Sequence, residues 1–211
     1  GPRHPQTIAI ASKLARIFEN GGNYDSAISL RNIISETMES IFGPTHFLAL
    51  KEYELLSFVY RSSGDIDSAF GVLDYVCGVY DSTVANLHPR SLKCRSVLAD
   101  FFSERGNLSK AYETRTQISG HFKFLGRESD RLALENLIDL GELSRQKGAL
   151  KEAEKLLVKT KDLAKTQGFV VLERKASSYL SRAYADSGDL EKASIVLETL
   201  IVDLNKDKLK E

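Results

Sequence analysis

Leucine, alanine and other small side chains recur along this chain in one fixed phase, with a period of 42 residues that shortens to 40 in the last unit. A glycine followed five residues later by an alanine occurs five times, and a leucine stands eight residues before each of these glycines. The residue after that leucine is always small, and three positions further on it is aromatic in four of the five units. The glycines are Gly22, Gly64, Gly106, Gly148 and Gly188, and the leucines are Leu14, Leu56, Leu98, Leu140 and Leu180. Positions spaced i, i+1 and i+4 share one face of an α-helix, so the pattern predicts a helix before each glycine.

The residues after each glycine predict a second helix in every unit. Glycine favours the left-handed conformation that ends a helix. An asparagine or aspartate follows four of the five glycines and can cap the next helix. We therefore expect first helices near 5–20, 46–62, 88–104, 130–146 and 171–186, and second helices near 24–41, 66–81, 108–123, 150–166 and 190–206.

This succession of leucine, small residue, aromatic and later alanine resembles the tetratricopeptide repeat (TPR), and the 42-residue period resembles the longer form found in kinesin light chains. The segments "FGPTHFLAL" (42–50) and "NLHPRSL" (86–92) are similar to those that precede first helices in that family. The resemblance implies an all-α, right-handed α-solenoid of five TPR-like repeats and about ten antiparallel helices. The repeats would lie near 4–45, 46–87, 88–129, 130–170 and 171–206 and form a single domain over 1–211.

The resemblance also implies a protein-interaction scaffold that binds a peptide or helical segment of a partner in a concave groove. First helices line that groove, and their phase selects the residues that face it. Phe58 and Ile138 are apolar residues on an otherwise charged and polar face, so they can anchor a partner. The alternative is that this mixed-charge face is simply solvated. The predicted partner-binding residues are Ser12, Arg16, Glu19, Lys51, Glu54, Phe58, Arg61, Lys93, Ser96, Asp100, Glu135, Ile138, Glu142, Arg145, Lys175, Ser178 and Arg182. The paired asparagines that line the groove of kinesin light chains are missing from the equivalent positions, so that family's peptide specificity does not carry over.

The last predicted helix, which contains "ASIVLETLIVDL" (193–204), is apolar on more than one face. Its own repeat leaves Ile195, Ile201 and Val202 uncovered, whereas the ends of solenoids need a polar cap. Three interpretations stay open: further repeats follow, the helix pairs with a second copy in a homodimer, or it is tolerably exposed. The chain begins with Gly1 and Pro2 and without methionine, so we expect the natural protein to be longer.

Charge and composition narrow the classes of partner. Lysine plus arginine and aspartate plus glutamate each number 29, and a chain without basic excess is not expected to bind nucleic acid. No apolar stretch approaches the ~20 residues of a membrane span. Cys77 and Cys94 fall on separate predicted helices, and we expect free thiols that pack as small apolar side chains in a reducing, cytoplasmic location. Arg31 and Arg115 share a register, and we expect their stems to pack while their charges stay in water.

The histidines do not indicate catalysis. His4, His46 and His88 occupy the same position before successive first helices, and Asp130 takes that position in the fourth repeat. The position therefore favours a polar residue that starts a helix. Sites one repeat apart are separated by at least ~8–10 Å, too far for the side chains to share a metal ion. We expect no enzyme activity, no metal and no cofactor. The predicted function is protein binding, and the alternative is a structural or self-association segment of a larger multidomain signalling protein that pairs through its terminal helix.

Overall fold

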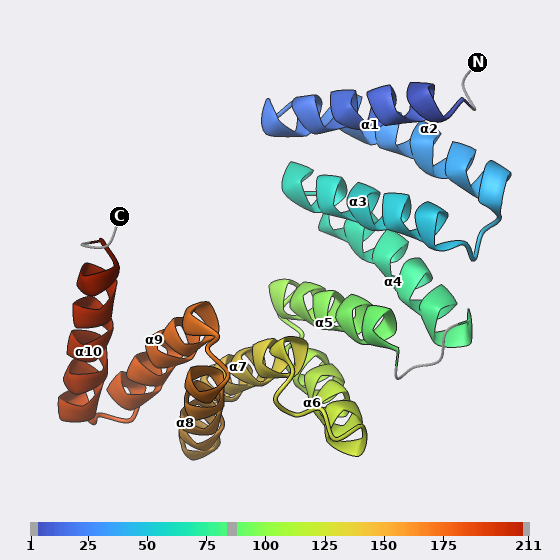
Figure 1. Ribbon diagram of the computed structural model, residues 1–211. Coiled ribbons are helices and arrows are strands. Elements are labelled where there is room, and N and C mark those ends of the chain that lie inside the picture. Colours follow the sequence, from blue (N-terminus) through green and yellow to red (C-terminus); the bar gives the residue numbers. More distant parts are fainter. Residues whose placement is uncertain (1–3, 84–87, 209–211) are drawn as a thin grey trace. The chain divides into compact units, whose positions relative to one another are not determined.

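The computed structural model describes residues 4–83 and 88–208, without the side chains of residues 204 and 206–208. Within these residues the chain forms ten α-helices and no strand (Figure 1). The helices are α1 (Pro5–Asn20), α2 (Tyr24–Phe42), α3 (Phe47–Ser63), α4 (Ile66–Thr83), α5 (Pro89–Glu104), α6 (Leu108–Phe124), α7 (Arg131–Gln146), α8 (Leu150–Thr166), α9 (Val170–Asp186) and α10 (Leu190–Lys208). Every predicted boundary lies within two residues of the observed one, which confirms the all-α fold class.

The repeated glycine joins the two helices of each unit. Gly64 has a φ of 89°, a left-handed conformation that glycine adopts without a steric penalty. The next amide, that of Asp65, donates to the carbonyl of Tyr60 and closes the end of α3. The Asp65 carboxylate accepts a hydrogen bond from the Ser68 amide at 3.0 Å and caps α4. Asn23, Asn107 and Asp189 cap α2, α6 and α10 in the same way.

The recurring histidines start helices, as predicted. The Nδ1 atom of His4 accepts the amide of Gln6, and His46 and His88 accept the equivalent amides at 3.2–3.3 Å. A side-chain acceptor at this position satisfies one of the free amides of the first turn. Asp130 has the same extended backbone before α7, but its carboxylate is bound by the Arg127 guanidinium instead.

Small residues allow the two helices of each unit to approach closely. The repeat alanines, Ala27, Ala69, Ala111, Ala153 and Ala193, are all buried. Gly141 in α7 shows such a close approach, because a β-carbon added there would lie 2.7 Å from the Leu157 Cγ atom of α8. The core thus follows the phase of the sequence repeat.

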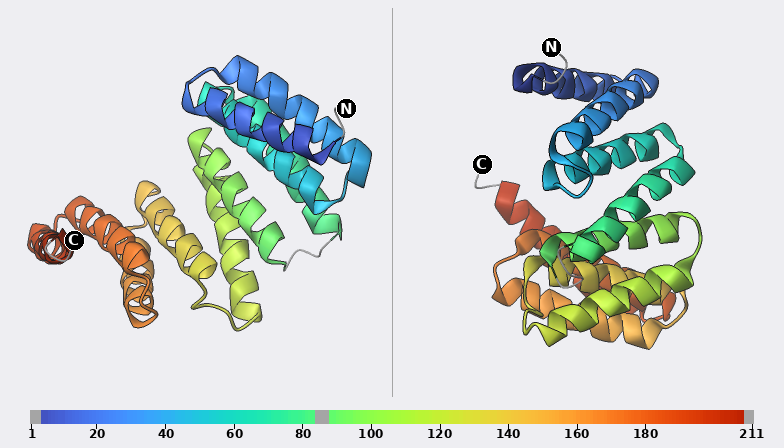
Figure 2. Two further views of the ribbon diagram at one scale, coloured as in Figure 1. Left: turned by 45° about the horizontal axis from the view of Figure 1, so that its top comes forward. Right: turned by 90° about the vertical axis from the view of Figure 1, so that its right-hand side faces the viewer.

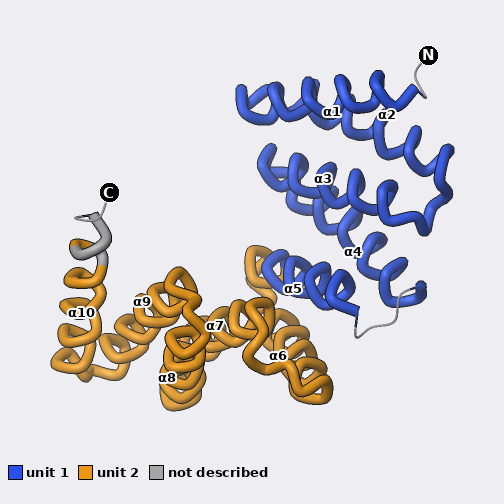
Figure 3. Tube along the Cα trace, viewed as in Figure 1, with its two compact units in different colours: residues 1–101 blue, residues 102–211 orange. Residues whose placement is uncertain are grey.

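The chain divides into two compact units, residues 1–101 and 102–211 (Figure 3). Within the first unit α2 packs between α1 and α3, and α3 packs on α4. Within the second unit consecutive helices from α6 to α10 pack on one another (Figure 2). The single domain over 1–211 and the right-handed course of the whole array stay predictions. None of the helices in the described part combines the length and the apolar character that a bilayer crossing requires.

Candidate partner-binding faces

The residues predicted to face a groove lie on α1, α3, α5, α7 and α9, and all but one of them are exposed or half-buried. Ile138 is the exception, because its side chain is completely buried and packs in a core cluster with Leu134, Leu157 and Ala176. The prediction that Ile138 anchors a partner is therefore wrong. The equivalent residues Ser12, Glu54, Ser96 and Ser178 are half-buried, so an apolar side chain at this border position turns into the core.

Phe58, the other predicted anchor, is 44% exposed on α3. Beside it is a hollow of about 220 Å³ that is also lined by Glu19 and Asn20 of α1 and Tyr24 of α2. Arg61, one turn further along α3, places its guanidinium 5.1 Å from the ring centre of Phe101. This face of the first unit combines an exposed aromatic ring, a hollow and charged groups.

Glu54 lies one turn before Phe58 and is half-buried. Burial raises the pKa of its carboxyl, and the hydrogen bond from Tyr80 and the positive charges of Lys93 and Arg90 offset only part of that rise. Burial and the nearby Glu54 carboxylate together raise the pKa of Tyr80 to about 12. Tyr80 therefore stays protonated at neutral pH, and its hydroxyl donates a hydrogen bond to the Glu54 carboxylate.

In the second unit the predicted face is crossed by ion pairs within the chain. Arg145 of α7 binds both carboxylate oxygens of Glu142 at 2.7 and 2.8 Å and also contacts Asp186 of α9. The Lys175 ammonium of α9 binds Asp139 of α7 at 2.7 Å. The Arg145–Asp186 and Lys175–Asp139 pairs join α7 to α9, and three side chains of the predicted face, Glu142, Arg145 and Lys175, already have partners inside the molecule.

Sequence reasoning missed Asp139 and Asp186 because neither lies in the predicted groove phase. It also missed Tyr179, whose ring carries the Lys175 ammonium 5.7 Å and the Arg182 guanidinium 5.4 Å from its centre. The aromatic ring and its two cations come from a single helix at spacings of three or four residues, so their proximity could have been inferred from the sequence.

One position in α2 and in α6 contacts the first helix of the next repeat. Arg31 occupies this position in α2 and is buried, with its guanidinium bound to Glu19 of α1 at 2.8 Å and to Glu52 of α3 at 3.0 Å. The expectation that its charge stays in water is wrong. Two carboxylates compensate the buried charge, and this compensation makes its burial tolerable.

Arg115 of α6 occupies the same position and is also buried, which corrects the same expectation. Its guanidinium reaches Asn136 at 3.3 Å and Asp139 at 3.2 Å on α7. The Asn136 amide in turn donates to the Arg115 carbonyl and to Ser119. Both arginines contact a polar residue exactly one half-repeat later, at a separation of 21 residues, and that shared offset is the sequence signal for these contacts.

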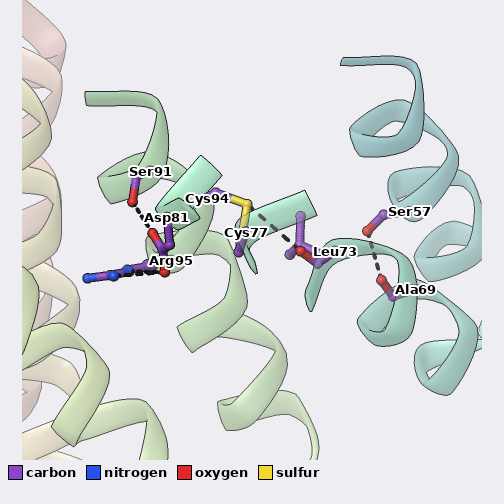
Figure 4. Close-up of a disulfide and its surroundings, with 8 residues drawn as sticks. All are labelled: Ser57, Ala69, Leu73, Cys77, Asp81, Ser91, Cys94 and Arg95. Carbon is purple, nitrogen blue, oxygen red and sulfur yellow. Dashed lines mark hydrogen bonds and ion pairs between the residues drawn. A yellow bond between two sulfur atoms is a disulfide. The ribbon is translucent and has the colours of Figure 1, made fainter. Parts of the chain in front are cut away.

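The junction between α4 and α5 uses a covalent bond, one turn after the position that Arg31 and Arg115 occupy. Cys77 and Cys94 form a disulfide with a Cα–Cα distance of 5.5 Å (Figure 4). The prediction of two free thiols is wrong. Cys77 and Cys94 do not form a CxxC motif, but they meet in space where α4 packs on α5. Asp81 adds contacts with Ser91 and Arg95 across the same pair of helices. A disulfide is rare in reducing compartments, so this bond weighs against the cytoplasmic location, which stays a prediction.

The terminal helix α10 exposes the three residues predicted for self-association. Ile195, Ile201 and Val202 are each about half exposed. Ile195 also lines a pocket of about 570 Å³ between α8, α9 and α10, together with Val170 and Arg174. The described residues contain no cluster of three histidine, cysteine or acidic side chains that could hold a metal ion.

Comparisons with solved structures identify proteins of similar fold. No family model and no curated protein matches the chain. One similar structure contains the TPR-like repeats of a Podosopora anserina kinesin light chain, which are nearly identical to one another. Its sequence is 21% identical to this chain, and the TM-score is 0.78 over 97% of this chain and 98% of that one. BtubC (BKLC) of P. vanneervenii is 16% identical, with a TM-score of 0.81 over 95% of this chain and 82% of that one.

A third similar structure is the Rap conjugation gene regulator of the plasmid pLS20 in complex with the Phr* peptide. It is 18% identical, with a TM-score of 0.66 over 95% of this chain and 54% of that one, so this chain spans about half of its length. At such identities the likeness concerns the fold alone. The chain is an all-α repeat protein with the TPR-like fold that its 42-residue period predicts.

Proposed function

We propose that this chain is a protein-interaction scaffold and that a segment of another protein binds on the face of its first unit. The fold supports the proposal, because TPR-like repeats generally serve as non-catalytic scaffolds and the structure of the Rap regulator, which has a similar fold, is of its complex with the Phr* peptide. We propose that the chain acts by binding and not by catalysis. The balanced charge supports a protein partner rather than a nucleic acid.

The observation that carries the proposal is the exposed ring of Phe58 beside its hollow. Aromatic residues supply much of the binding energy in protein interfaces when a partner excludes water from them. An apolar side chain of the partner would pack on Phe58 in that hollow. Arg16 and Lys51, which lie exposed on α1 and α3, would contact acidic groups beside it. The other predicted groove residues of the first unit are proposed as its flanks, and those of the second unit, without Ile138, stay a separate prediction.

A peptide display library selected on the whole chain tests this proposal. The dissociation constant of a selected peptide would be measured by fluorescence anisotropy for the unaltered chain and for Phe58→Ala. We expect at least about tenfold weaker binding, because loss of an aromatic anchor commonly costs 2 kcal/mol or more. Phe124→Ala is the matched control, since Phe124 is an exposed phenylalanine on α6 outside this face. Failure to select any peptide, or equal affinities for the Phe58 variant and the unaltered chain, would overturn the proposal.

A further inference from the structure

The last second helix, α10, exposes the register that every earlier repeat buries. Leu197 is the fifth member of the series Arg31, Leu73, Arg115 and Leu157, and the four earlier members are buried while Leu197 is 43% exposed. Two of the earlier members bond directly to the next first helix, Arg31 to Glu52 and Arg115 to Asn136, and the Leu73 carbonyl lies 3.9 Å from the Cys94 sulfur. Ile201 follows Leu197 by one turn at the register of Ser35 and Cys77, and it is 56% exposed. We call Leu197 and Ile201 the tail face.

The first helix, α1, exposes the complementary register. Ile10 is the first member of the series Glu52, Cys94, Asn136 and Ala176, which are the residues that receive those contacts and are all buried. Ile10 itself is 67% exposed. Leu14 and Ile17, on the same side of α1, are 42% and 64% exposed, whereas their equivalents in the other four repeats are buried. We call Ile10, Leu14 and Ile17 the head face.

The two faces match in chemistry as well as in register. The four internal junctions each bring together side chains of matching chemistry: an arginine with a carboxylate, a cysteine with a cysteine, an arginine with an asparagine oxygen, and, between α8 and α9, apolar Leu157 with Ala176 in one core cluster. At the outer junction both sides are apolar, because Ile10 takes the receiving position and Leu197 and Ile201 take the contacting ones. Burial of such side chains is favourable, and packing of this kind already holds consecutive repeats together.

We propose that copies of this chain stack head to tail, with the tail face of one copy covering the head face of the next as a further repeat junction. The inference goes beyond the proposed function and uses surfaces other than the Phe58 face. The two faces differ, so the contact is heterologous and extends into open chains unless the rotation closes a ring. Ile195 and Val202, which lie on another side of α10, stay outside this contact.

Sedimentation velocity over a wide concentration range tests the proposal on the whole chain. The unaltered chain should show an average mass that keeps rising with concentration. Ile10→Asp, which blocks only the head, and Ile201→Asp, which blocks only the tail, should each raise the dissociation constant at least tenfold. An equimolar mixture of the two variants should recover one contact, between an intact head and an intact tail, and stop at dimers. Phe124→Asp, at an exposed phenylalanine on neither face, is the control and should associate as the unaltered chain does.

Other occupants of these faces give different results. A symmetric pairing of two α10 helices would leave Ile10→Asp fully associated, would limit the unaltered chain to dimers, and would give no recovery on mixing. A face covered by a helix of a different protein would leave the unaltered chain monomeric at every concentration. Either result overturns head-to-tail stacking. Circular dichroism spectra and melting temperatures that match the unaltered chain would establish that both aspartate variants are folded.

Discussion

Reduction of the Cys77–Cys94 disulfide should loosen the packing of α4 on α5 by a predictable amount. The bond joins residues separated by 17 positions and therefore restricts a loop of that size in the unfolded chain. The chain-entropy relation for such a loop gives a stabilisation of roughly 3 kcal/mol at 25 °C. Both cysteines are buried, so their thiols would be retained in the core after reduction and the loss should come mainly from the unfolded state.

Hydrogen exchange followed by mass spectrometry measures this loss where it occurs. Some amides of α4 and α5 exchange only when the first unit unfolds, and on reduction their protection factors should fall roughly a hundredfold. This factor is the loss of roughly 3 kcal/mol converted at about 1.4 kcal/mol per factor of ten. The amides of α8 and α9, in the second unit, serve as an internal control and should not change. A variant with both Cys77→Ala and Cys94→Ala should be indifferent to the reductant.

Two results would refute this reasoning. Alkylation of the unfolded, unreduced chain should label neither cysteine; labelling of both would mean that the bond does not form. Unchanged protection of α4 and α5 after complete reduction would mean that the loop restriction contributes nothing, and that helix packing alone holds this junction.

Three further substitutions test the core and one ion pair. Leu98→Ala should lower the free energy of unfolding by about 2–5 kcal/mol, since the side chain is buried, and a loss below this range in chemical denaturation would argue against its packing. Gly141→Ala should lose about 1 kcal/mol net, because crowding against Leu157 at 2.7 Å outweighs the better helix propensity of alanine; a gain in stability would contradict the close approach. Burial by itself raises the pKa of Glu142, but the hydrogen bonds and the positive charge of Arg145 together lower it by more than burial raises it. The pKa of Glu142 in the folded chain therefore lies below its value in the unfolded chain. The resulting stabilisation is complete above the unfolded pKa of about 4.3 and is lost as the pH falls through the folded value. Glu142→Gln should therefore cost on the order of 1 kcal/mol at neutral pH and less in acid, as measured by urea denaturation at both pH values.

The helices, their turns and their buried small residues could be predicted from the sequence alone. Each depends on residues a few positions apart: the glycine that ends a helix, the aspartate or asparagine that caps the next, and the leucine and small residue that share a helical face. Five copies in one phase make these local rules unambiguous. The same reasoning identified the histidines before three of the first helices as helix starts, and the structure confirmed it through the Nδ1 hydrogen bonds.

The contacts between repeats were decided only by the tertiary structure. Arg31 and Arg115 are buried because carboxylates and amides on neighbouring helices compensate their charge, and Ile138 is buried because the core of the second unit has room for it at the border of the exposed face. Cys77 and Cys94 form a bond because two helices place them at the same junction. A repeat period states which positions are equivalent, but each position meets a different neighbour, and burial, charge compensation and covalent pairing depend on that neighbour. The sequence therefore determined the repeating architecture of this protein, and packing between helices determined which of its polar and apolar residues remain available to a partner.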